Sequence, residues 1–277
     1  MNLSANVSRA IEMYRQSEYA VAVTDFFSPE EKIEVYNELI ARIGNGISRC
    51  FFWGGSRGAE RCTTVFLPEW YMPESVPVHR MPGDEARTDC FAEHLEEHPE
   101  ILEEIPITAL TIQGSGFKAL THRDFMGGIL SLGIDRSVVG DIAVLSESEA
   151  IVFVSKRIAP YIVSELTKIG RDGVKTEICD INPMFRIPRR YEETVITVAS
   201  PRLDGVVKAI TGKSRETAAD MVKAGLVELS YKSEMPISTE VKDGDILSVR
   251  GYGKYVIGGV SGQTKSGRLR IICKKYL

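Results

Sequence analysis

The segment from Arg202 to Val249 limits the possible folds more than any other part of the chain. The apolar residues between Leu203 and Ile210 recur at spacings of three and four, so they share one face of a helix. Ser200 is expected to cap this helix, with Pro201 as its first residue, and Gly212 is expected to end it. The spacing therefore predicts one short amphipathic helix at the start of a compact module.

A second helix and a small sheet follow in the same segment. Ser214 can cap the second helix, and Gly225 can close it. Residues 227–229 alternate as a strand does, Asp243-Gly244 is a tight-turn pair, and residues 246–249 can pair back as a second strand. The pattern predicts two helices packed together beside a sheet.

The outward residues of this module are mostly basic. Cations at helix starts favour phosphate, because the helix amides there also attract anions. The candidate RNA-binding residues of this segment are Arg202, Lys208, Lys213, Ser214, Arg215, Lys223, Arg250 and Lys254. Solvated surface charge remains an alternative for any single lysine, whereas the position of Arg202 and Arg215 favours a functional interpretation.

Charge is distributed unevenly along the chain. From Arg186 onward there are 17 Lys and Arg residues against 10 Asp and Glu, a balance of +7; the totals of 34 and 38 leave 17 against 28 before it, a balance of −11. The basic part is therefore the candidate for nucleic-acid binding. In the acidic part, residues 84–104 hold nine acids and one arginine, which indicates a solvated helix that could also repel RNA.

Length and composition favour a cytoplasmic protein with more than one core. The chain has 277 residues, 43% of them hydrophobic, without an apolar run that could span a membrane and without a basic leader. Its five cysteines are scattered and form no C-x-x-C pair, which favours reduced thiols over a disulfide framework or a zinc ribbon. We expect a monomer when free, with no cofactor and no bound metal.

The N-terminal part is predicted to combine helices with a strand pair. Helices are expected near residues 8–15 and over residues 29–43, the latter with Ser28 as cap and Gly44 as stop. Residues 48–53 and 62–67 are typical of strands. The glycine-rich arginine loop between them, residues 54–61, is interpreted as a hairpin connection, with a phosphate-holding loop as the alternative.

The hydrophobic pattern in the middle third of the chain predicts elements in the order β-α-β-β-α-β. This order is the split unit of ferredoxin-like folds. The expected strands are residues 108–113, 141–145, 150–154 and 174–181, and the expected helices are residues 121–132 and 156–169. Many RNA-binding domains share this order, but the aromatic strand signature of RNA-recognition motifs is absent. Base stacking on this sheet is therefore not predicted.

Two motifs in this part imitate other functions. Residues 114–119 resemble a dinucleotide fingerprint, but the next helix is expected to start at Thr121, too late for the glycines to open it. Residues 94–98 match the H-x-x-E-H order of some zinc peptidases, but no third acidic ligand is evident. Cofactor and metal binding are therefore minor alternatives.

A second group of candidate RNA-binding residues is His122, Arg123 and Arg136. His122 and Arg123 are expected in the first turn of a helix, and Arg136 lies close to them if that helix ends near Gly133. These cations could bind phosphate. Alternatively, Asp124 and Asp141 could pair with them and hold the helix against the sheet.

The C-terminal module resembles the S4 RNA-binding domain. The family pattern of R-L-D, S-R-x-x-A, G-x-V and V-x-x-G-D-x-I-x-V is matched by residues 202–204, 214–218, 225–227 and 241–249. One departure concerns the turn after the first strand, where the family usually has Asn-Gly or Asn and this chain has Ser230 and Tyr231.

A wider resemblance covers nearly the whole chain. The Gly-Ala-Glu-Arg loop at 58–61, the stretch at 120–125, residues 140–142 and 166–170, and the C-terminal module are together similar to the bacterial YlmH family. The resemblance implies a ribosome-associated RNA-binding protein without catalysis of its own. It further implies contact with rRNA of the large ribosomal subunit and with peptidyl-tRNA, in quality control of stalled nascent chains.

Two other functional classes remain as alternatives. S4-type modules also occur in pseudouridine synthases and RNA methyltransferases, and Arg202-Leu203-Asp204 superficially matches the start of a pseudouridine synthase motif, although no T-S-G continuation follows. An adaptor could instead use the aromatic residues at 51–53, 70 and 71 to contact a protein.

The sequence thus predicts an α+β protein of three segments. They are an N-terminal α/β region over residues 1–104, a ferredoxin-like βαββαβ domain over 105–185, and an S4-type domain of two helices and a sheet over 186–277.

Overall fold

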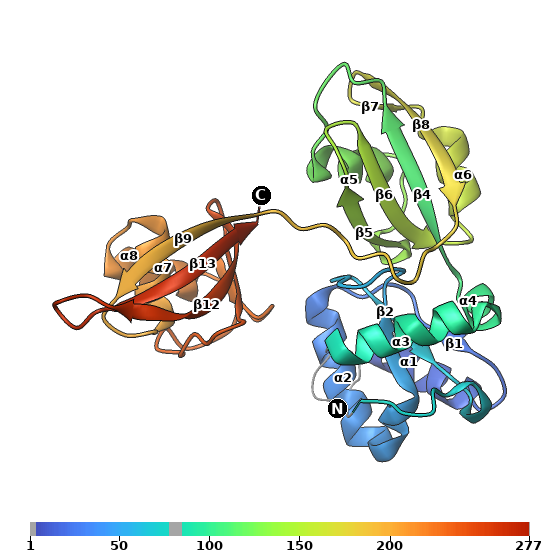
Figure 1. Ribbon diagram of the computed structural model, residues 1–277, viewed down its shortest axis with the longest axis horizontal. Coiled ribbons are helices and arrows are strands. Elements are labelled where there is room, and N and C mark those ends of the chain that lie inside the picture. Colours follow the sequence, from blue (N-terminus) through green and yellow to red (C-terminus); the bar gives the residue numbers. More distant parts are fainter. Residues whose placement is uncertain (1–3, 78–84, 277) are drawn as a thin grey trace. The chain divides into compact units, whose positions relative to one another are not determined.

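The computed structural model describes residues 4–77 and 85–276. It is a mixed α+β structure, as predicted, and it divides into two compact units, Met1–Pro188 and Arg189–Leu277 (Figure 1). The predicted boundary at 185/186 lies close to this division. The further boundary at 104/105 stays a prediction, since it falls inside the first unit.

The N-terminal region of the first unit surrounds a sheet of order β1-β3-β2 with helices. Its helices are α1 (Ala5–Gln16), α2 (Pro29–Ile43), α3 (Glu85–Glu97) and α4 (Pro99–Glu104), with short 3-10 turns η1 (Gly44–Arg49) and η2 (Glu69–Tyr71). Its strands are β1 (Ala22–Val23), β2 (Cys50–Trp53) and β3 (Thr63–Phe66). β2 and β3 pair antiparallel, which confirms the predicted strand pair.

Helix α2 shows how local sequence sets an element. The Ser28 hydroxyl accepts a hydrogen bond from the Glu31 amide, and the Glu31 carboxylate accepts one from the Ser28 amide. This capping box satisfies donors that a helix start leaves without partners. At the other end Gly44 adopts a φ of 50°, which favours glycine. The predicted bounds of this helix are confirmed.

The acidic stretch is more than a solvated helix. Its described part, from residue 85 onward, forms α3 and α4, and Phe91 and Leu95 of α3 are fully buried; Asp84 lies outside the described residues. Arg87 is also buried, donates hydrogen bonds to the backbone oxygens of Ser48 and Cys50, and lies over the Phe51 ring. One face of α3 therefore belongs to the core.

Most of the aromatic residues considered for an adaptor surface are also buried. Phe51, Phe52 and Trp53 of β2 lie in the core, whereas Trp70 is 63% exposed. Core packing therefore accounts for three of these side chains. Among the described residues, no helix combines the length and apolar character that crossing a bilayer requires.

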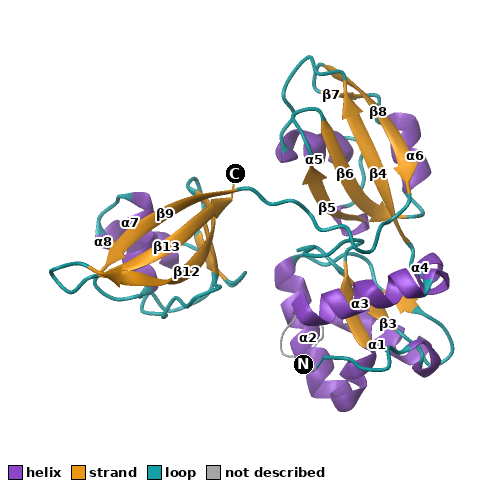
Figure 2. Ribbon diagram, in the orientation of Figure 1, coloured by secondary structure: helices purple, strands orange, loops and turns teal. Residues whose placement is uncertain are grey.

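The rest of the first unit is a five-stranded antiparallel sheet of order β5-β6-β4-β8-β7 (Figure 2). Its strands are β4 (Ile107–Gly114), β5 (Val139–Val144), β6 (Glu149–Ser155), β7 (Lys168–Ile169) and β8 (Asp172–Cys179). The helices are α5 (His122–Leu130) and α6 (Ala159–Glu165), with the 3-10 turn η3 (Arg136–Val138). The main strands and helices follow the predicted β-α-β-β-α-β order.

One predicted helix of this region is too long. Residues 156–169 were expected to be helical throughout, but α6 ends at Glu165 and Lys168–Ile169 form the edge strand β7. Ile169 of β7 is buried in the hydrophobic core of this sheet and its helices. Its neighbour Gly170 adopts a φ of 62°. The apolar spacing that suggested a helix therefore serves a short hairpin with β8 instead.

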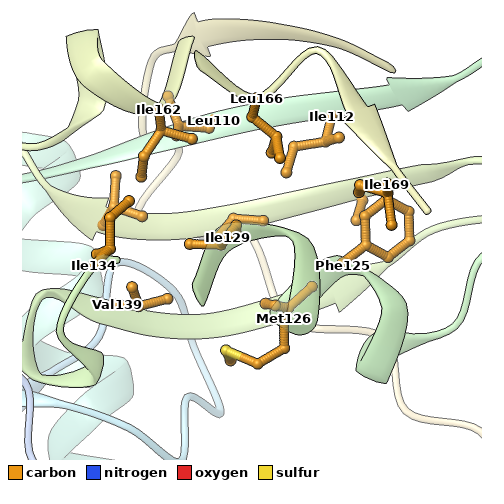
Figure 3. Close-up of a cluster of buried hydrophobic side chains, with 14 of the residues drawn as sticks. Leu110, Ile112, Phe125, Met126, Ile129, Ile134, Val139, Ile162, Leu166 and Ile169 are labelled. Atoms are coloured by element: carbon orange, nitrogen blue, oxygen red, sulfur yellow. The ribbon is translucent and has the colours of Figure 1, made fainter. Parts of the chain in front are cut away.

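A single core joins α5 and α6 to this sheet (Figure 3). Phe125 and Ile129 of α5, Ile162 of α6 and Leu110 and Ile112 of β4 are all fully buried. Burial of large apolar side chains is the main stabilising contribution in such a core. It fixes α5, whose first turn carries His122 and Arg123.

The second unit places two helices on one face of a sheet of order β10-β11-β12-β13-β9 (Figure 2). Its strands are β9 (Tyr191–Val198), β10 (Val227–Leu229), β11 (Ile246–Val249), β12 (Gly253–Gln263) and β13 (Leu269–Tyr276). Its helices are α7 (Leu203–Thr211) and α8 (Arg215–Lys223). Both helices and the inner face of the sheet share one core.

Candidate nucleic-acid interface

Arg202 and Arg215 lie together because both donate to one buried carboxylate. Asp204 is 2% exposed; its Oδ1 accepts a hydrogen bond of 3.2 Å from Arg202 Nε, and its Oδ2 accepts one of 2.8 Å from Arg215 Nε. The two arginine side chains are themselves 40% and 62% exposed. Because the bonds engage Nε, the terminal nitrogens of both guanidinium groups can bind an anion from solvent. We call Arg202, Asp204 and Arg215 the arginine clamp.

The charge state of Asp204 follows from its neighbours. Burial by itself raises the pKa of the carboxyl, but hydrogen bonds from Arg215 and Arg202 outweigh it and hold the pKa below the ordinary value. Asp204 is therefore ionised at neutral pH. It fixes the side-on orientation of both guanidinium groups while the clamp keeps a net positive charge.

The start of α7 differs from the sequence prediction. The helix begins at Leu203, and no side chain caps it, so Ser200 is not the cap. The amides of Leu203 and Asp204 instead donate to the backbone oxygens of Thr239 and Ile237. Backbone acceptors from a distant segment thus satisfy the donors that a capping side chain would have served. This arrangement also fixes Asp204 in the first turn.

The start of α8 agrees with the prediction. The Ser214 hydroxyl accepts a hydrogen bond from the Thr217 amide and lies 2.9 Å from Thr217 Oγ1. The helix ends before Gly225, whose φ is 68°. The Ser214 hydroxyl is thus engaged as a helix cap, and its contact with RNA stays a prediction.

The remaining candidates of the second unit are spread over its surface. Lys208, Lys213 and Arg250 are exposed, and Lys223 forms an exposed ion pair of 3.8 Å with Asp220. Lys254 is different, because it is half-buried between aromatic rings on the sheet. The structure therefore unites Arg202 and Arg215 in one site and assigns Lys254 to another surface.

In the first unit, His122 and Arg123 occupy the first turn of α5, and Arg136 begins η3. Although His122 as a residue is exposed, partial desolvation of its imidazole lowers the pKa; Asp141 opposes this effect and Arg136 adds to it. His122 is therefore mostly neutral at pH 7 and suits hydrogen bonding to RNA better than charge pairing. Arg123 and Arg136 are exposed.

The two aspartates expected to pair with these cations have other partners. Asp124 forms a capping box with Thr121 and an ion pair with Lys118, and hydrogen bonds from Thr121 lower its pKa to about 2. Asp141 accepts hydrogen bonds from the backbone amides of Glu60 (2.6 Å) and Arg61 (3.2 Å). These bonds fix Asp124 at the start of α5 and join Asp141 to the loop at residues 60–61.

The glycine-rich loop between β2 and β3 is built into the fold. Arg61 is 8% exposed and donates to the backbone oxygens of Val139 and Arg136, both at 2.9 Å. Arg57 forms a close ion pair with Asp89. The arginines of this loop therefore act as structural links, which agrees with the hairpin interpretation. Sequence reasoning missed Arg61, because its partners are backbone atoms distant in the chain.

The two motifs that imitate other functions have structural roles as well. Helix α5 begins at His122, so the glycines at 114 and 116 do not open it, as expected. In the H-x-x-E-H segment, His94 Nε2 lies 2.7 Å from the backbone oxygen of Tyr71, and His98 contacts Glu100. All five cysteines are free thiols.

The chain is similar in sequence to known proteins. Residues 102–182 match the family model described as "Putative RNA-binding domain in YlmH". The chain is 27% identical over 270 residues to the ribosome-associated protein quality control protein P2 of Bacillus subtilis strain 168, covering 96% of this chain and 93% of that protein. A solved structure of the cell division protein ylmH from Streptococcus pneumoniae aligns with a TM-score of 0.43 and 18% identity, covering 67% of this chain and 98% of that one.

The sequence matches agree with the motifs that first suggested a relationship. The family-model match covers β4 to β8, which includes His122, Arg123 and Arg136, and the similarity to the Bacillus protein extends over nearly the whole chain. The predicted resemblance to the YlmH family is confirmed: residues 102–182 match the RNA-binding domain model of that family, and nearly the whole chain is similar in sequence to the Bacillus quality control protein.

Proposed function

We propose that the protein is a non-catalytic RNA-binding factor that associates with the large ribosomal subunit through rRNA. The observation that carries this proposal is the arginine clamp, in which the buried Asp204 carboxylate presents two exposed guanidinium groups side by side. The similarity to a ribosome-associated quality control protein supports the ribosome as the partner. By the same relationship, we propose contact with peptidyl-tRNA during quality control of stalled nascent chains, in the cytoplasm.

The chemistry of the clamp suits an RNA backbone. A guanidinium group donates several hydrogen bonds in one plane and matches the geometry of phosphate oxygens. Holding two such groups on one carboxylate reduces the conformational entropy that each loses on binding. The clamp contacts phosphates, and phosphates carry no information about the base sequence. It therefore selects RNA by the shape of the folded backbone.

The geometry also argues against the enzymatic alternative. In a pseudouridine synthase the aspartate of the Arg202-Leu203-Asp204 motif would have to reach a substrate. Here Asp204 is buried, Oδ1 accepts from Arg202 Nε and from the Gly205 amide, and Oδ2 accepts from Arg215 Nε. Its carboxylate is a structural centre of the binding site, which supports a non-catalytic role.

The proposal is tested by co-sedimentation of the full-length protein with purified ribosomal subunits. We expect retention on large subunits and little retention on small subunits at equal concentration, with binding that weakens as salt rises. The same preparations are assayed for uridine isomerisation and for methyl transfer to rRNA, where no turnover is expected. Equal retention on both subunits, or turnover in either assay, would contradict the proposal.

A further inference from the structure

A row of aromatic and basic side chains crosses the solvent face of the second unit's sheet. Tyr191 of β9 pairs in register with Tyr276 of β13, and the rings meet edge to face with centroids 5.0 Å apart. Lys254 of β12 lies on the other side of Tyr276, with Nζ 5.0 Å from the ring centroid. These residues alternate with buried neighbours such as Cys273 and Tyr255, so they point away from the core.

Two further side chains complete this surface. The Lys254 Nζ lies 5.0 Å from the centroid of Tyr231 and 3.4 Å from its hydroxyl. The Arg189 guanidinium lies 5.8 Å from the Tyr276 centroid and donates to its hydroxyl at 3.3 Å. We call Arg189, Tyr191, Tyr231, Lys254 and Tyr276 the tyrosine platform. Strand register and burial place Tyr191, Lys254 and Tyr276 on the face of the sheet opposite the buried core. Helices α7 and α8 pack on that core face (Figure 1).

The turn that positions Tyr231 is strained. Leu229 and Lys232 exchange both backbone hydrogen bonds around a two-residue turn, in which Ser230 has a φ of 47° and Tyr231 a φ of 66°. Among the described residues, Ser230 and Tyr231 are the non-glycine residues that have a positive φ. Glycine or asparagine adopts this conformation at a lower cost. A bulky tyrosine at such a position indicates that its side chain has a use outside the turn.

Exposure and charge identify what the platform can bind. Tyr191 is 39% exposed, and Tyr231, Lys254 and Tyr276 are half-buried, so each of these residues is accessible to solvent in part. The platform carries two cations, Lys254 and Arg189. Beside it, Lys274 of β13 lies opposite Glu193 of β9 in the strand register. Exposed aromatic rings next to cations are the combination by which proteins hold single-stranded nucleic acid, because bases stack on the rings and phosphates contact the cations.

We propose that the tyrosine platform is a second RNA-binding site, which stacks an unpaired nucleotide of single-stranded RNA while Lys254 and Arg189 contact its phosphates. This inference rests on the proposed RNA-binding function and adds a ligand class that the arginine clamp does not select. The clamp takes the backbone of structured RNA, whereas the platform requires a base that is free to stack. The two sites lie on different faces of one unit, so one RNA could engage both where a helix ends in a single strand.

The test compares two RNA probes on the full-length protein. One is a fluorescein-labelled oligouridylate, and the other is a labelled blunt RNA duplex of the same length, which offers no unpaired base. Tyr276→Leu and Tyr231→Gly should each weaken binding of the single strand by about fivefold or more and leave duplex binding unchanged. Tyr19→Leu is the matched control; it removes a 77% exposed tyrosine of the first unit, outside the platform, and should bind both probes as the wild type does.

The variant Tyr231→Gly separates a binding role from a structural one. Glycine relieves the positive φ of the turn, so the variant should fold with a thermal stability at or above that of the wild type. Loss of single-strand binding with retained stability supports the platform. Unchanged single-strand binding in both tyrosine variants, while the wild type still binds the duplex, would overturn the platform and leave the proposed function intact. A wild type that binds neither RNA would overturn both.

Discussion

Replacing Asp204 with asparagine should lower the free energy of unfolding of the second unit by about 2 to 3 kcal/mol. The substitution removes a buried negative charge that two guanidinium groups share. The asparagine side chain replaces one carboxylate oxygen with an NH2 group, which is itself a donor and would face an arginine N–H donor. Because the arginines are 40% and 62% exposed, water compensates part of the loss, which keeps the effect below that of a fully buried ion pair. RNA binding should weaken as well, since both arginines lose their orientation.

Measuring this loss requires a probe within the second unit. Both tryptophans, Trp53 and Trp70, lie in the first unit, so tryptophan fluorescence does not report on the second. Hydrogen exchange of peptides from residues 189–277 over a urea series is suitable. The matched control is Asp220→Asn, which removes an exposed aspartate 3.8 Å from Lys223 and should cost less than about 0.5 kcal/mol. Equal losses in the two variants would contradict the buried role of Asp204.

The effect of Asp204→Asn should depend on pH in a defined direction. The folded-state pKa of Asp204 is below its unfolded value, so the ionised carboxylate stabilises the fold above the unfolded pKa of about 4. This contribution is lost as pH falls through the folded pKa. The difference between wild type and variant should therefore be constant near neutral pH and shrink under acid conditions. A difference that grew as pH fell would contradict the assignment.

Replacing Arg61 with alanine should destabilise the first unit by about 3 kcal/mol. The side chain is 8% exposed and donates to two backbone oxygens, those of Val139 and Arg136, which would be left without this donor. The loop that carries Arg61 also supplies the amides bound by Asp141. The substitution should thus loosen the link between the loop and β5.

Urea unfolding followed by tryptophan fluorescence checks this prediction, since Trp53 is buried and directly precedes the loop. Arg157→Ala is the matched control, because Arg157 is 67% exposed and pairs with Asp25 at 3.5 Å. It should cost well under about 1 kcal/mol. If Arg61→Ala were as mild as the control, the loop would not depend on this buried guanidinium.

Features set by neighbouring residues could be predicted from the sequence. The caps of α2, α5 and α8 involve side chains three residues from the amides they bind, so Ser28, Thr121 and Ser214 were recognisable as helix starts. Gly212 and Gly225 marked helix ends for an equally local reason. The order of strands and helices in the middle of the chain followed from hydrophobic periodicity.

Features set by distant residues could not be predicted. The first turn of α7 is held by the backbone of Thr239 and Ile237, so no capping side chain marked its start. Arg202 and Arg215 are candidates by position and Asp204 is expected in the binding helix, but the hydrogen bonds that join both arginines to Asp204 depend on how the two helices pack. The tyrosine platform was missed because strand register brings Tyr191, Lys254 and Tyr276 together from three separate strands.

The arginine clamp is tested most directly by the salt dependence of binding to large ribosomal subunits. The association constant is measured over a potassium chloride series for the wild type, for Arg202→Ala/Arg215→Ala, and for Arg9→Ala/Arg42→Ala, which removes the same charge from exposed helical ion pairs. The clamp variant should bind more weakly, and the slope of log K against log salt should fall by about 2 in magnitude. The Arg9/Arg42 variant should keep the wild-type slope. Equal slopes for all three proteins would contradict the assignment of Arg202 and Arg215 as phosphate contacts.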